Sequence, residues 1–170
     1  MRASCVRWLG LLVLAAPACG SGNGASPFMP TTPVPDACSM LALPDVQTLL
    51  PGAAAGMPLA PDDNTDAWTR GCEWDGSGGM AITLIVEGAL TSNGKVVLGT
   101  VVDVTSTSTR QATPVSGVGD KAVYLVNQGL DQILNALQGS IVVSLAAYNF
   151  TPEASEASLE PLVLEALDKL

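Results

Sequence analysis

An acidic loop carries the side chains that are best suited to metal binding. Asp62, Asn64 and Asp66 have the spacing of the first, third and fifth positions of a calcium-binding EF-hand loop, in which Glu73 would be twelfth. The sixth position of such a loop is glycine, whereas this chain has Ala67, and no clear helix flanks the segment. Acidic loops are common in acidic proteins. The favoured interpretation is therefore a solvated loop with no metal or cofactor, and calcium binding is the alternative.

The cysteines suggest one modification and one crosslink. Cys5 lies in a stretch typical of an export leader, so an exported chain would keep Cys19, Cys38 and Cys72. An odd number of thiols is unusual in an exported protein. If Cys19 carries a lipid, Cys38 and Cys72 can pair as a disulfide and no thiol remains over.

Catalytic residues are not evident. The chain contains no histidine, which is the commonest general base. No Ser–Lys pair or cysteine-based site stands out. With 16 acidic residues, some pair of carboxylates is expected to lie close together by chance. The sequence thus predicts no catalytic residue and no enzyme activity, and a hydrolase that uses two carboxylates is the alternative.

Three other features have structural explanations. The segment Val115–Lys121 holds two glycines and an aspartate, but it lacks the pattern of a phosphate loop and no helix follows. It is expected to be a turn that needs positive φ before a strand. Trp74 is expected to pack on the disulfide, and Trp68 to be a partly buried anchor rather than a ligand-stacking residue.

Composition and charge limit the partners. The chain has 170 residues, of which 48% are hydrophobic and 14% charged, enough for one folded domain. Arg2 and Arg7 lie in the leader, which leaves five basic residues against 16 acidic ones, a net charge of −11. Such a surface repels nucleic acids and anionic lipid headgroups, so no nucleic-acid partner is expected.

Residues 1–18 have the plan of a signal peptide, with a positive start, a short apolar run and Ala16-Pro17-Ala18 before Cys19. This arrangement resembles the bacterial lipoprotein leader, in which the cysteine becomes the lipidated N-terminus. Such leaders usually have leucine where this chain has Ala16, so cleavage by ordinary signal peptidase is the alternative. Residues 19–35 are rich in Gly, Ser and Pro and predict a lipid-anchored flexible linker, which would hold the domain roughly 20–40 Å from the membrane.

Residues 36–170 predict a single α+β domain. A short helix is expected from Pro44 to Leu50, a loop over residues 53–66, and a closing amphipathic helix within residues 152–170, with Thr151 as its N-cap. Pro161 predicts either a kink in that helix or a start near residue 158. Strands are expected at 72–74, 80–87, 121–126, 133–137 and 141–148, with a helical turn as the alternative at 131–137.

Residues 92–109 are ambiguous. Val and Thr are abundant from Lys95 to Thr105, which favours a strand. Val97, Leu98, Val101, Val102 and Thr105 also fit the stripe of a helix. Because residue propensities favour it, we predict a strand over Lys95–Thr105.

Three motifs occur in a fixed order: Ala37-Cys38-Ser39-Met40-Leu41, Gly71-Cys72-Glu73-Trp74 and Val118-Gly119-Asp120-Lys121-Ala122. Together with the leader they resemble small secreted lipoproteins of unknown function that are widespread in actinobacteria. The resemblance covers residues 36–170 in outline. It implies an antiparallel sheet, similar to PsbP-like folds, packed by a short N-terminal helix and a C-terminal amphipathic helix. It also implies a Cys38–Cys72 disulfide and a helix within residues 92–109, but no agreed activity.

The expected function is an extracytoplasmic binding or interaction module of the cell envelope. It would be anchored to the membrane through lipid on Cys19, and its ligand is unknown. Envelope proteins or a small apolar ligand are the expected partners. The alternative is a structural envelope lipoprotein without a small-molecule ligand, and an apolar pocket or an exposed apolar patch would distinguish the two.

Overall fold

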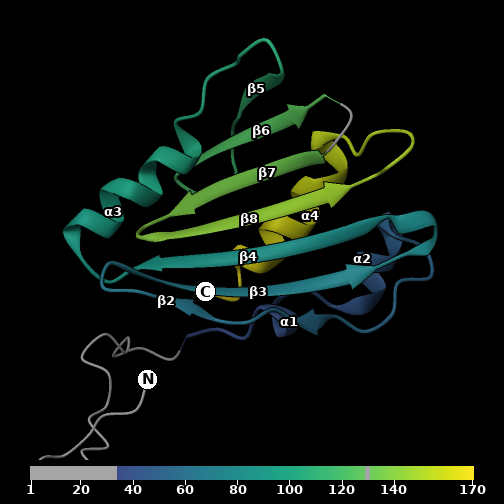
Figure 1. The fold of residues 1–170 in the computed structure, drawn as a ribbon, viewed down its shortest axis with the longest axis horizontal. Helices are drawn as coiled ribbons and strands as arrows, with labels where there is room; N and C mark the ends of the chain where they lie inside the picture. Colours follow the sequence, from purple (N-terminus) through teal and green to yellow (C-terminus); the bar gives the residue numbers. More distant parts are fainter. Residues whose placement is uncertain (1–33, 129–130) are drawn as a thin grey trace, which may run out of the picture.

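A computed structural model describes residues 34–128 and 131–170. The signal peptide, Cys19 and nearly all of the expected linker lie outside the described residues. The described part is an α+β fold built on an eight-stranded antiparallel sheet, with strand order β1-β3-β4-β8-β7-β6-β5 and β2 also paired with β3 (Figure 1). Of its helices, none is long and apolar enough to cross a membrane.

Helices and strands are interspersed along the chain. The strands are β1 (Met57–Pro58), β2 (Asp62–Asp63), β3 (Ala67–Asp75), β4 (Ala81–Ala89), β5 (Arg110–Val115), β6 (Lys121–Asn127), β7 (Asp131–Gln138) and β8 (Ile141–Tyr148). The helices are α1 (Ala37–Met40), α2 (Leu43–Leu49), α3 (Ser92–Gly99) and α4 (Glu156–Leu167), with 3₁₀ turns η1 (Ser77–Gly79) and η2 (Thr100–Val102).

One face of the sheet forms the main core. Alternate residues of β4, β7 and β8 point to this face, because side chains alternate along a strand. They pack against α4, which lies behind the sheet in Figure 1, and against α1 and α2. The buried face of α4 consists of Leu159, Leu162, Val163, Ala166 and Leu167, as the periodicity predicts. The helical periodicity of the sequence also predicts Leu170 on this face, but α4 ends at Leu167 and Leu170 is exposed.

The other face is partly covered by α3 and η2. Thr91 caps α3, since its hydroxyl accepts a hydrogen bond from the Gly94 amide. Val102 of η2 then packs with Val123 and Leu125 of β6 in a second, smaller apolar cluster. The strand predicted over Lys95–Thr105 is therefore wrong, and a helix followed by a 3₁₀ turn occupies this stretch.

Four smaller features differ from the expectations. The loop expected at residues 53–66 contains the two-residue strands β1 and β2, and β3 begins five residues before Cys72. The edge strand β5 was not expected. Thr151 is not the N-cap of the last helix, because Ser155 holds that position and α4 continues through Pro161.

The predicted disulfide is present. Cys38 of α1 bonds Cys72 of β3, with their Cα atoms 5.0 Å apart. This crosslink fixes the short N-terminal helix against the sheet. Lys169 reinforces the same corner from the far end of the chain, because its Nζ donates to the Met40 carbonyl at 2.8 Å and to Glu165 at 2.7 Å.

Candidate functional site

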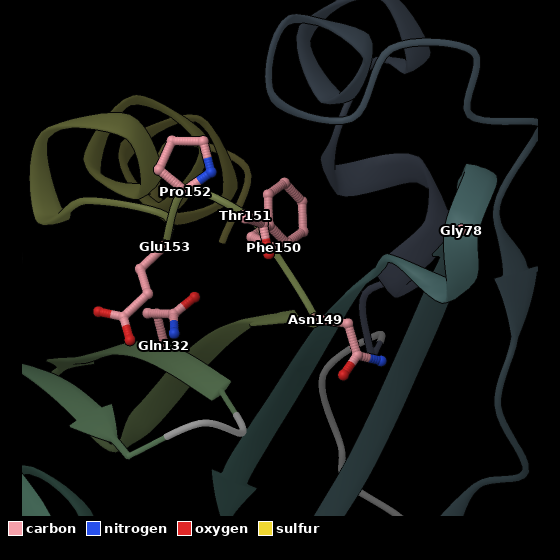
Figure 2. A pocket seen from close by; sticks show the side chains of 7 residues that line it. All are labelled: Gly78, Gln132, Asn149, Phe150, Thr151, Pro152 and Glu153. Carbon is pink, nitrogen blue, oxygen red and sulfur yellow. The ribbon is translucent and has the colours of Figure 1, made fainter.

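A cavity of about 610 Å³ lies where β8 ends, between the loop that leads to α4, the turn η1 and the first residues of β7 (Figure 2). Its volume is within the range of ligand pockets, about 300–1,000 Å³. The lining combines amide, carboxylate, hydroxyl and ring groups, from Gly78, Gln132, Asn149, Phe150, Thr151, Pro152 and Glu153.

Asn149 joins the loop to the turn. The residue has φ of 59°, in the left-handed region that asparagine tolerates better than most residues. Its Nδ2 donates to the carbonyl of Gly79 at 2.9 Å. One side of the cavity is thus fixed by a contact between segments 70 residues apart in sequence.

Gln132 forms the buried polar wall. It is only 3% exposed and lies on the face of β7 that also carries Leu134 and Ala136. Its Oε1 accepts a hydrogen bond from the Ala154 amide at 3.2 Å, and its Nε2 donates to no residue that the structure describes. The Ala154 carbonyl in turn accepts from the Tyr124 hydroxyl at 2.5 Å. Two strands therefore hold the loop at a single residue.

Glu153 gives the cavity its charge. The side chain is exposed at the mouth, and in Figure 2 it lies on the same side as Gln132. Burial raises the pKa of Tyr124 above its ordinary value, and the negative charges of Glu153 and Glu156 raise it further. The phenol therefore stays protonated and keeps donating to the loop.

Phe150 and Pro152 supply the apolar part of the lining. Phe150 is half-buried and packs against the main core, which anchors its ring. Both residues lie between Asn149 and Glu153 in the chain, so the apolar and polar groups alternate along one short loop. The arrangement offers a ring surface beside hydrogen-bonding groups, and Glu153 is the sole carboxylate in the lining described here. That lining does not contain the carboxylate pair of a hydrolase.

A second hollow, of about 520 Å³, lies between η2 and the turn from β5 to β6. Its lining is rich in valine, including Val102, Val104 and Val123. An ion pair between Lys121 and Asp103 joins its two sides. The turn itself is the segment Val115–Lys121, and the glycines at 117 and 119 have φ of 85° and 58°, as a turn needing positive φ predicts.

The calcium candidates do not come together. Asp62 pairs with Thr69 across β2 and β3, whereas Glu73 lies four residues further along β3, a separation of about 13 Å. Asn64 accepts from the amides of Asp66 and Ala67, in the manner of an Asx turn.

Asp66 has a structural task. Its carboxylate accepts hydrogen bonds from Thr91 and Asn93, which lowers its pKa and ties the loop to the start of α3. In residues 34–128 and 131–170 no three His, Cys, Asp or Glu side chains form a metal-binding group.

Both tryptophans are core residues. A Cβ on Gly56 would lie 2.4 Å from Cys72 Sγ and 2.7 Å from the Trp74 indole, so this glycine covers the disulfide and the tryptophan together. Trp68 packs over Gly88 on the neighbouring strand, where a Cβ would lie 2.3 Å from the indole. Neither indole lines a cavity described above.

The residues of the cavity were not predicted from the sequence. Gln132 did carry a signal in the sequence. It is a polar residue at the position two before Leu134 and four before Ala136, and therefore on the buried face of the same strand. Asn149 and Phe150 directly follow a strand, but nothing in the sequence shows that the loop meets η1. Comparisons with protein families, with curated proteins and with solved structures find no match to this chain.

Proposed function

We propose that the chain is a lipid-anchored binding module of the cell envelope that holds a small molecule in the cavity beside Gln132. The burial of Gln132 in the cavity wall carries this proposal. The Ala154 amide partners Oε1. Among the described residues no buried side-chain nitrogen or oxygen lacks a hydrogen-bond partner, so Nε2 is not an unpaired buried group. We expect Nε2 to face the cavity, where a polar ligand would replace water as its partner.

The support around the cavity suits binding. Asn149 is held to Gly79, and Ala154 is held by both Gln132 and Tyr124. A loop ordered in this way before the ligand arrives loses less conformational entropy on binding. The entropic cost of ordering the loop then lowers the ligand affinity less than it would for a flexible loop.

The proposed location follows from the N-terminal sequence. Export by residues 1–18 and lipid on Cys19 would place the domain outside the cytoplasm, at the end of a linker. A disulfide between Cys38 and Cys72 agrees with an oxidising compartment. Because the net charge without the leader is −11, the membrane contact would be the lipid and not the protein surface.

A second candidate ligand is a small apolar molecule in the valine-lined hollow. The observation that favours it is the presence of Val102, Val104 and Val123 in one lining of about 520 Å³. In the cavity beside Gln132, an apolar ligand would leave the Gln132 amide and the Glu153 carboxylate without new partners. An envelope lipoprotein that contacts other proteins and holds no small molecule is the rival function.

Native mass spectrometry of the lipoprotein purified from its own envelope tests the proposal. The wild-type protein should retain a small molecule, and Gln132→Met should lose it. Asn135→Leu is the matched control, because Asn135 is a buried amide of the same strand, 5% exposed, that bonds the Val101 carbonyl on the opposite face of the sheet. A wild-type protein without any retained molecule would favour the structural role, and retention by Gln132→Met would place the ligand elsewhere.

A further inference from the structure

The cavity beside Gln132 has two chemically different parts, which Figure 2 shows from close by. The rings of Phe150 and Pro152 lie along one part of the lining. Gln132 and Glu153 lie along another, and Asn149 lies toward the turn η1. A lining of this kind complements a ligand with one apolar face and several hydrogen-bonding groups at its edge.

The polar groups favour hydroxyl groups as partners. A carboxylate accepts hydrogen bonds at two oxygens, so Glu153 can receive two neighbouring hydroxyls. A carboxamide both donates and accepts, and a hydroxyl can do either. Glu153 forms no ion pair with another residue in the described part of the chain, so its oxygens are open to a ligand.

Other ligand classes fit less well. An apolar molecule would bury the Gln132 amide and the Glu153 carboxylate without new partners. An anion would be repelled by Glu153 and by Glu156, which act together on the nearby Tyr124. An organic ammonium ion could pair with Glu153, but one phenyl ring and one proline do not form the aromatic cage that such ions prefer.

We infer that this cavity binds a neutral saccharide. The C–H face of a sugar ring lies against Phe150, and hydroxyls at the ring edge bond Glu153 and Gln132. The cavity of about 610 Å³ has room for one or two six-membered rings. This inference rests on the proposed function, since it names the ligand class of the same cavity.

Saturation-transfer NMR with maltose, cellobiose and N,N′-diacetylchitobiose, each at millimolar concentration, tests the inference on the folded protein. At least one disaccharide should receive saturation. Glu153→Ala should weaken its binding roughly tenfold or more, because a hydrogen bond to a charged group is lost. Glu153 is exposed, so this variant should fold normally. Asp168→Ala removes an exposed acid outside the lining and should bind as the wild type does.

Choline serves as the cationic probe. Saturation of choline that depends on Glu153, with all three sugars silent, would overturn the saccharide inference. The absence of saturation transfer to any of the three sugars would overturn the saccharide inference too. In that case native mass spectrometry decides about the proposed binding function. A retained non-sugar molecule that is lost in Gln132→Met would support that function, whereas the absence of any retained molecule would contradict both the inference and the function. Equal sugar binding by wild type and Glu153→Ala would also contradict the inference.

Discussion

The Tyr124 hydroxyl donates a hydrogen bond to the Ala154 carbonyl at 2.5 Å, across 30 residues of sequence. The Ala154 amide is bonded by Gln132 from the neighbouring strand. Both polar groups of one loop residue are therefore satisfied by side chains of β6 and β7. This double contact explains how the loop from β8 to α4 keeps one conformation beside the cavity.

Tyr124→Phe should loosen this loop while leaving the sheet intact. The change leaves a carbonyl without its donor, and the free energy of unfolding should fall by about 1–2 kcal/mol. Hydrogen exchange should speed up in residues 149–154 more than in β7. Tyr148→Phe is a suitable control, because Tyr148 is the other tyrosine of the chain and takes no part in the hydrogen bond to Ala154. Equal exchange in wild type and Tyr124→Phe would contradict the role given to the hydroxyl.

Alkaline pH should destabilise the fold. Burial is the main cause that raises the pKa of both Tyr124 and Tyr148, and nearby acids add to it. The unfolded phenols lose their protons near pH 10, at a pH where the folded ones keep theirs. The unfolded state then binds fewer protons, so the free energy of unfolding falls as the pH rises from about 10 through the folded pKa values. Urea denaturation at about pH 8 and about pH 11 should show this loss, and Tyr124→Phe/Tyr148→Phe should reduce it.

Two glycines of α3 should respond in opposite ways to alanine. A Cβ on Gly94 would lie 2.1 Å from the Asp66 carbonyl oxygen, whereas a Cβ on Gly99 would meet nothing within 4 Å. Gly94→Ala should therefore push α3 from the sheet and cost about 1–3 kcal/mol, as overpacking does. Gly99→Ala should be neutral or stabilising by up to about 1 kcal/mol, because alanine favours helix. Urea denaturation of both variants measures the contrast, and equal effects would contradict the docking described for α3.

The stretch containing α3 also shows where sequence reasoning fails. Its valines and threonines favour a strand, but the Thr91 cap and the contact with Asp66 outweigh that propensity. Val97 points to solvent, while Leu98 and Val102 are buried. Tertiary packing therefore decides which residues of the predicted helical stripe are buried.

The local sequence pattern predicts strands with a buried face better than it predicts exposed strands. The strands β4, β7 and β8 have buried alternate residues, so their periodicity predicts them. The edge strand β5 has no such alternation because most of its residues are exposed. The cavity depends on the meeting of Asn149 with Gly79, which no local pattern encodes. Sequence thus predicts the scaffold and the disulfide but not the candidate site.

The outer edge of β5 is protected against pairing with another chain. The Ala112 amide donates to Ser106 Oγ at 2.9 Å, and the Arg110 carbonyl accepts from the Thr107 amide at 2.8 Å. Pro114, at the next alternate position, has no amide hydrogen. Ser106→Ala/Pro114→Val should free this edge and cause self-association that grows with concentration, as sedimentation velocity would show. Ser108→Ala is the control, and a monomeric double variant would contradict the protective role.

Removing the disulfide should destabilise the domain strongly. Cys38 and Cys72 close a loop of 34 residues, which on the chain-entropy model contributes about 4 kcal/mol. That is a large part of the roughly 5–15 kcal/mol typical of a domain. Cys38→Ala/Cys72→Ala should lower the melting temperature clearly, and the reduced wild type should melt near the double variant.

The position of Cys72 also predicts how the bond responds to reductant. Its side chain is fully buried, and Gly56 lies directly against Cys72 Sγ. A reducing thiolate can attack either sulfur of the bond, and attack at Cys72 Sγ requires the segment around Gly56 to move away. Cys38 is only half-buried. A reductant should therefore attack Cys38 in the native protein and form its mixed disulfide there, as trapping and peptide mass spectrometry would show. Melting of the double variant at the wild-type temperature would contradict the stabilising role of the crosslink. A mixed disulfide formed at Cys72 in the native protein would contradict the shielding of Cys72 by Gly56.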